Sequence, residues 1–73
     1  MGKPLGSQLE KEALAGASLR LRAADYLGSQ FERIAACCKK GGGRLTIYEA
    51  GTLLSSQREK IARAAPGQVS FEF

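Results

Sequence analysis

The feature that most constrains this chain is a stretch without proline that runs from Ser7 to Lys40. Alanine, leucine, glutamate, arginine and lysine dominate the stretch, and these residues are strong helix formers. Ser7 and Glu10 have the spacing of a capping box, and the three glycines after Lys40 provide a C-terminal stop. The sequence therefore predicts a long helix over residues 7–40.

That helix is long for a chain of 73 residues. At about 1.5 Å per residue it would extend roughly 50 Å, whereas a compact globule of this chain length is roughly 30 Å across. Either the helix breaks near Gly16 or Gly28, or part of it projects toward a partner. We expect a break near Gly16, because the residues after Gly16 carry the denser apolar stripe.

The predicted helix is amphipathic when residues are placed at about 100° intervals. Leu27, Phe31 and Ile34 lie on its apolar face and form a candidate self-association face. Arg20 interrupts the apolar stripe, so either its stem packs while the guanidinium reaches water, or the helix bends there. The opposite face aligns four cations that are the candidate nucleic-acid contacts: Lys11, Arg22, Arg33 and Lys40.

The C-terminal half has the pattern of a strand, a short helix and a second strand. Residues 44–49 and 68–73 alternate apolar and polar side chains. Between them, Ser56 and Glu59 form a second capping box, and Pro66 ends the helix. The connection is long enough for a helical crossover, which favours parallel strands, although the loops also allow antiparallel pairing.

We detect no internal repeat and no linker that would divide the chain. The predicted fold is one small α+β domain over residues 1–73, with a disordered N-terminus at 1–6. Its long N-terminal amphipathic helix, broken near Gly16, packs on a C-terminal β-α-β unit of two strands.

The residue inventory leaves little for catalysis or metal binding. Histidine is absent, so a serine or cysteine nucleophile has no imidazole base. Cys37 and Cys38 are adjacent, a spacing that does not suit an intramolecular disulfide and provides too few ligands for zinc. We therefore predict a protein without catalytic residues, cofactor or metal.

Charge and strand edges favour binding functions. Eleven lysines and arginines against seven acidic residues give a formal net charge of +4. A basic helix face can neutralise phosphates, but no aromatic residue lies among the predicted contacts to stack on bases. Two edge strands can pair with another chain. We expect an interaction or adaptor module that forms a homodimer and binds a protein partner, with nucleic-acid binding as the less favoured alternative.

The sequence contains no apolar run that approaches the length of about 20 residues needed to span a membrane. It also lacks the apolar segment of a secretory signal after its first residues. We expect a cytoplasmic protein without membrane contact.

Overall fold

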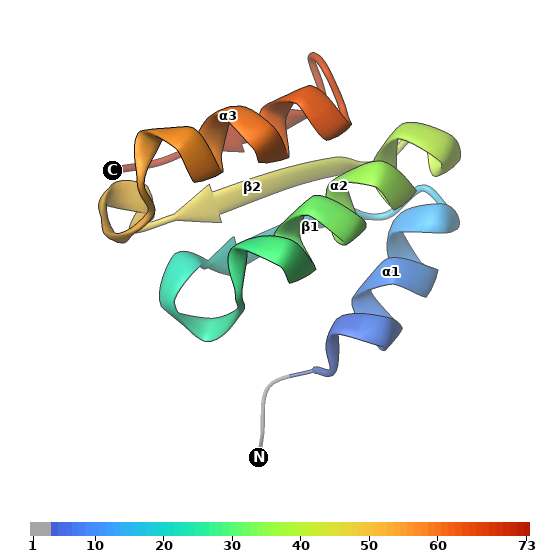
Figure 1. Ribbon diagram of the computed structural model, residues 1–73. Coiled ribbons are helices and arrows are strands. Elements are labelled where there is room, and N and C mark those ends of the chain that lie inside the picture. The colour runs from blue at the N-terminus through green and yellow to red at the C-terminus, as the bar shows by residue number, and fades with distance from the viewer. Residues whose placement is uncertain (1–3) are drawn as a thin grey trace.

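The computed structural model describes residues 4–73, in which three helices alternate with three strands (Figure 1). Two short 3-10 helices, η1 at Ala23–Asp25 and η2 at Ala50–Thr52, follow the first two strands. The helices and strands, in chain order, are α1 Gly6–Leu14, β1 Ser18–Arg22, α2 Gly28–Gly41, β2 Arg44–Tyr48, α3 Ser55–Ala64 and β3 Val69–Phe71.

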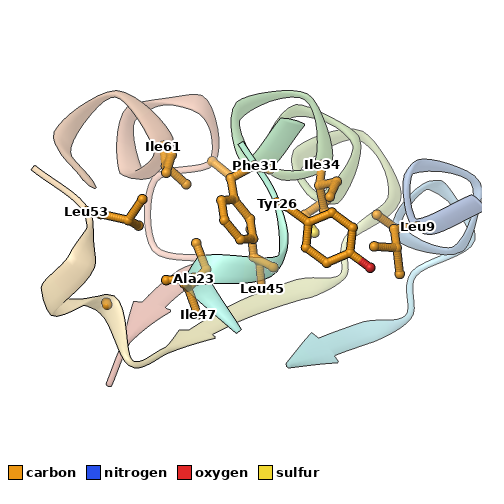
Figure 2. Close-up of a cluster of buried hydrophobic side chains, with 14 residues drawn as sticks. Leu9, Ala23, Tyr26, Phe31, Ile34, Leu45, Ile47, Leu53 and Ile61 are labelled. Atoms are coloured by element: carbon orange, nitrogen blue, oxygen red, sulfur yellow. The ribbon is translucent and has the colours of Figure 1, made fainter. Parts of the chain in front are cut away.

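The strands form one parallel sheet in the order β1-β2-β3. Leu21 is aligned with Ile47, and Ile47 is aligned with Phe71. Parallel neighbours need a crossover, and α2 and α3 provide the two crossovers. All three helices lie on the same side of the sheet (Figure 2). The prediction of parallel pairing is confirmed for the C-terminal strands, and the sheet has one strand more than predicted.

The long N-terminal helix was wrongly predicted from the sequence. α1 ends at Leu14, Gly16 adopts a left-handed conformation with φ of 92°, and the chain continues as β1. Within β1, Leu19 and Leu21 are half-buried while Arg20 is exposed. This alternation is the strand pattern, and it explains why Arg20 interrupted a stripe drawn for a helix. Gly16 does mark a break, but a strand follows it.

The helices begin earlier than the serine-based capping boxes predicted. α1 and α3 begin at Gly6 and Ser55, and glutamine occupies the capping position three residues after the leucine N-cap. Each glutamine Oε1 accepts a hydrogen bond from the backbone N–H of that leucine, at 3.1 Å in α1, 2.8 Å in α2 and 2.9 Å in α3. This satisfies one of the backbone donors that a helix N-terminus leaves free.

These starts reveal an internal repeat, which corrects the expectation that none exists. The motif Leu-Gly/Ser-Ser-Gln recurs at residues 5–8, 27–30 and 54–57, and a helix and a parallel strand follow it each time. Spacings of roughly 20–30 residues are typical of proteins built from stacked supersecondary units. The protein is therefore a row of three helix-strand units.

The core lies between the helices and one face of the sheet (Figure 2). Leu45 and Ile47 of the central strand are fully buried there. Phe31 of α2 and Ile61 of α3 cover them, and the Phe31 ring meets Tyr26 edge to face at a centroid distance of 5.8 Å. A chain this small therefore concentrates its burial around β2 and α2.

The glycine triplet at the C-terminal end of α2 is required by the backbone conformation and by close packing. Gly42 ends the helix in the left-handed conformation, with φ of 81°. A Cβ on Gly41 would lie 2.2 Å from the carbonyl oxygen of Ala13, and one on Gly43 would lie 2.3 Å from that of Ala17. The chain passes so close to the α1–β1 connection that only glycine fits.

At the N-terminus, residues 1–3 of the predicted disordered segment 1–6 lie outside the described residues. Leu5 is the N-cap of α1, and Gly6 is its first residue. The Tyr26 hydroxyl donates a hydrogen bond of 2.7 Å to the carbonyl oxygen of Pro4.

Candidate functional site: the open face of the sheet

The sheet has two different faces. The helices cover one face, and no helix of residues 4–73 lies over the other (Figure 2). Because side chains alternate along a strand, every second residue of each strand projects from the uncovered face. We call this surface the open face, and its residues are Ser18, Arg20, Arg22, Arg44, Thr46, Tyr48, Ser70 and Glu72.

The centre of the open face is a contact chain across the sheet. The guanidinium carbon of Arg20 lies 4.3 Å from the centre of the Tyr48 ring, a cation–π distance. Nη2 of Arg20 donates to Oε1 of Glu72 at 2.9 Å. The hydrogen bond and charge of Glu72 raise the pKa of Arg20 above its ordinary value. Both side chains are more than half exposed, so the pair is a surface feature that adds little to stability.

A second pair lies at the carboxyl end of the strands. Nε of Arg22 donates to Oε2 of Glu49, and this hydrogen bond and charge raise the pKa of Arg22. Glu49 has φ of 54°, and it is the one non-glycine residue among those described with a positive φ. A left-handed non-glycine residue is uncommon and marks local backbone strain, which concentrates at binding sites.

A shallow hollow of about 400 Å³ adjoins this pair. It lies where the three parallel strands end, the edge at which open parallel sheets commonly bind ligands. Phe73, which is 81% exposed, forms one wall, with the Arg58 guanidinium carbon 4.8 Å from its ring centre. The hollow is lined by Arg22, Ala24, Glu49, Gly51, Thr52 and Phe73.

The arrangement has the chemistry of recognition. Among the residues that the structure describes, no polar or charged side chain is buried. The arginines and glutamates of the two ion pairs are exposed to water, which leaves their charges screened. The open face thus combines an aromatic platform, arginine donors and carboxylates on a surface that a macromolecule can reach.

The four predicted nucleic-acid contacts do not share one surface. Arg22 lies on the open face in β1, whereas Lys11 belongs to α1 and Arg33 and Lys40 belong to α2. They were grouped on the premise of one continuous helix, and the strand at Ser18–Arg22 removes that premise. Whether any of them contacts nucleic acid stays a prediction.

The predicted self-association face is largely internal. Phe31 and Ile34 are fully buried in the core of the chain itself, and only Leu27, at 69% exposed, reaches the surface. Leu27 is the N-cap of α2, so it lies outside the regular turns of that helix. Self-association therefore needs a different surface.

Sequence reasoning missed the central residues of the open face. Arg20 was placed within a helix, and Tyr48 and Glu72 were placed on two strands. Because the strand that carries Arg20 was not predicted, nothing brought the three residues together. The alternation of Ser18, Arg20 and Arg22 with apolar residues was the available signal.

The cysteines play no visible part in this surface. Both are free thiols of α2; Cys38 is buried in the core and Cys37 is half-buried. Burial, with a smaller contribution from Cys37, raises the pKa of the Cys38 thiol. Within residues 4–73 no three acidic, cysteine or histidine side chains gather in a way that could hold a metal ion.

No family model matches the chain, and neither a curated protein nor a solved structure matches it. In the described part of the chain, none of the helices has the length and apolar character to cross a membrane. The functional interpretation therefore rests on the geometry of the open face.

Proposed function

We propose that this protein is a non-enzymatic interaction module that binds a protein partner on the open face of its sheet. The observation that carries the proposal is Tyr48 on the uncovered face, at the carboxyl end of the central strand, with the Arg20 guanidinium stacked on its ring. Tyrosine and arginine are the side chains most enriched among the energetically dominant residues of protein interfaces. Row-like stacks of repeats commonly use one extended face for binding.

The partner that fits this surface carries an apolar or aromatic group flanked by acidic side chains. The apolar group would pack on the Tyr48 ring, and the acidic groups would compete with Glu72 and Glu49 for the two arginines. Arg44 adds a third cation at the amino end of β2. The open face alone holds three arginines and one glutamate, so it favours acidic partners.

Nucleic acid is the second candidate, because the fold places Tyr48 directly opposite Arg22 and in contact with Arg20. Aromatic side chains on an exposed sheet, with cations beside them, can stack on the bases of single strands. Glu72 and Glu49 weaken this reading, because each neutralises an arginine that would contact phosphate. We therefore rank it below a protein partner.

Affinity capture with the tagged full chain tests the proposal. Wild type is compared with Arg20→Gln/Tyr48→Ser, which alters the open face, and with Lys11→Gln/Arg33→Gln, which alters the outer surface of α1 and α2. Each capture is repeated after nuclease treatment, and the captured proteins are identified by mass spectrometry.

We expect a protein captured by wild type and by the helix-surface variant, lost with the open-face variant and insensitive to nuclease. Capture that persists in the open-face variant would contradict the proposed site. Capture that nuclease abolishes, together with salt-sensitive binding of single-stranded RNA or DNA, would favour the second candidate.

A further inference from the structure

Each flank of the row of repeats ends in a helix and a strand that have a neighbour on one side only within residues 4–73. α2 packs between α1 and α3, and the strands follow the same order (Figure 1). Within residues 4–73, β1 has β2 on one side and no strand on the other, and the same holds for β3. We infer that copies of this chain stack end to end, with β3 of one copy pairing in parallel with β1 of the next.

The backbone of β3 offers an edge for this pairing. The carbonyl of Gln68 accepts from Leu45 N–H, and the N–H of Glu72 donates to the Ile47 carbonyl. The N–H and C=O of one residue point to the same side of a strand, and those of the next residue point to the other side. The N–H and C=O groups of Val69 and Phe71 therefore point away from β2. Exposed strand edges of this kind pair readily with another chain.

Both edges also carry incompletely buried apolar side chains. Leu19 and Leu21 of β1 are half-buried, although the register pairs them with the fully buried Leu45 and Ile47. Phe71 of β3 is also half-buried, although the register pairs it with the fully buried Ile47. A β1 strand placed beside β3 would complete the burial of both sets, as β2 does within the chain.

A glutamine contact links successive repeats, and the corresponding position on α3 is exposed. The Gln30 side chain lies against Gly6, with Nε2 3.3 Å from the position that a Cβ would occupy. Gln57 lies against Gly28 in the same way at 3.2 Å. Ser55 holds the corresponding position in α3 and is exposed. In a stack, Gln8 of the following copy would lie against Ser55, shifted slightly relative to the interior contacts because Ser55 carries a Cβ where Gly6 and Gly28 have none.

The flank of α3 carries a cation where the interior is apolar. Four residues after the leucine N-cap, α1 and α2 have Leu9 and Phe31, both buried. Because α1 has only α2 beside it, this position faces the following repeat. In α3 the same position is Arg58, which is only half-buried and lies against the exposed Phe73.

The flank of α1 carries the complementary charge. Seven residues after the leucine N-cap, α2 and α3 have Ile34 and Ile61, both fully buried. Both helices have a preceding helix beside them, so this position faces the preceding repeat. In α1 the position is Glu12, which is exposed. End-to-end stacking brings Arg58 of one copy to Glu12 of the next, which sets the register by charge.

This interface is heterologous, since two different surfaces meet. It therefore produces an open row of copies and not a closed two-fold dimer. The open faces of successive copies would form one continuous surface. The inference goes beyond the proposed function, and the stacking surfaces lie outside the open face, so either can fail alone.

Charge reversal at the two flanks tests the inference, with mass measured by sedimentation velocity and light scattering over a range of concentrations at low salt. Wild type should grow beyond the 7.8 kDa chain in concentration-dependent steps. Arg58→Glu or Glu12→Arg alone should weaken association by about tenfold, since each places like charges together. Arg58→Glu/Glu12→Arg should restore it, and mixing the two single variants should also restore it.

Matched controls reverse charges that face solvent. Lys11→Glu in α1 and Arg63→Glu in α3 should leave association unchanged, because their equivalents in the flanked helix α2, Arg33 and Ala36, are exposed. A wild type that remains at the 7.8 kDa mass at every concentration would overturn the inference. So would a dimer that stops at about 16 kDa, or a double variant that fails to recover association.

Discussion

The two faces of the sheet differ sharply although the same strands build both. On the helix side, Leu45 and Ile47 of β2 are fully buried. On the open face, Thr46 and Tyr48 of the same strand are partly exposed, and the Tyr48 ring contacts the exposed Arg20. One residue step along the strand therefore separates the stabilising side of the protein from its candidate binding side.

This separation lets the two tasks vary independently. The helix side obtains its stability from buried apolar area, at roughly 25 cal/mol per Å². The open face contains exposed ion pairs and a cation–π contact, which contribute little to stability but give chemical specificity. Substitutions on the helix side should therefore change folding, and substitutions on the open face should change binding.

The largest effect is expected at the centre of the core. Phe31→Ala removes a fully buried ring that packs edge to face on Tyr26, which should cost about 3–5 kcal/mol. A domain of this size has a total stability of roughly 4–11 kcal/mol, so the variant should lose a large share of its stability and unfold at a much lower denaturant concentration. Chemical denaturation followed by circular dichroism measures the loss. Ser29→Ala, exposed on the same helix, should change stability by less than about 0.5 kcal/mol, and a Phe31→Ala loss of similar size would contradict the core assignment.

The second effect concerns the close approach of α2 to the α1–β1 connection. Gly41→Ala would place a Cβ 2.2 Å from the Ala13 carbonyl oxygen, and we expect a loss of about 1–3 kcal/mol from the displaced backbone. Gly51→Ala is the control, because nothing lies within 4 Å of its Cβ position. Equal thermal midpoints for the two variants would show that these elements do not pack this closely.

Alkaline pH should weaken the helix side by a smaller amount. Burial raises the pKa of Cys38 and of Tyr26 in the folded protein. Above the unfolded thiol pKa of about 8.5, the unfolded chain releases a proton that folded Cys38 retains, so stability falls as pH rises. Above about pH 10 stability falls further, because folded Tyr26 likewise retains a proton that the unfolded chain releases. Below these pH values both groups are protonated in the folded and the unfolded state, so neither lowers the stability.

Denaturation midpoints measured from pH 7 to pH 10 reveal this slope. Cys38→Ala should flatten the part of the slope that begins near the thiol pKa, whereas Cys37→Ala, at the half-buried neighbour, should keep it. A midpoint that rises with pH in this range would contradict the buried position of Cys38.

The smallest stability effect is expected on the open face. Arg20→Gln removes the ion pair with Glu72 and the stacking on Tyr48, both of which are exposed. The thermal midpoint should fall by less than for Phe31→Ala or Gly41→Ala, and added salt should reduce the difference from wild type. Arg33→Gln on α2 removes the same charge from the helix surface and serves as the control. A large, salt-independent loss for Arg20→Gln would mean that the open face is part of the stabilising structure.

The C-terminal part of the fold could be predicted from the sequence because its patterns are local. Alternation identified the strands around Ile47 and Phe71, and the crossover length favoured parallel pairing, which is confirmed. The strand at Ser18–Arg22 was missed because its leucines and arginines are strong helix formers. Pairing with β2 makes this segment a strand despite its helix propensity. Such pairing between distant segments cannot be read from local propensity.

The candidate site could not be predicted for a related reason. Arg20, Tyr48 and Glu72 come from three segments that meet only when the three strands align. The internal repeat was visible in principle at residues 27–30 and 54–57, but the predicted helix ran across its first strand and hid the helix start at Gly28. Recognising the repeat would have placed all three helix starts and the missing strand together.

The most direct test of the two-sided sheet places the same new residue on each side of β2. Ile47→Thr and Tyr48→Thr are compared in guanidinium denaturation, since threonine suits a strand and so leaves backbone preference unchanged. We expect Ile47→Thr to lose about 2–4 kcal/mol, because it removes buried apolar volume and buries a hydroxyl in the fully enclosed core. Tyr48→Thr should lose less than about 1 kcal/mol, because the open face is not packed. Equal losses, or a larger loss for Tyr48→Thr, would contradict the account.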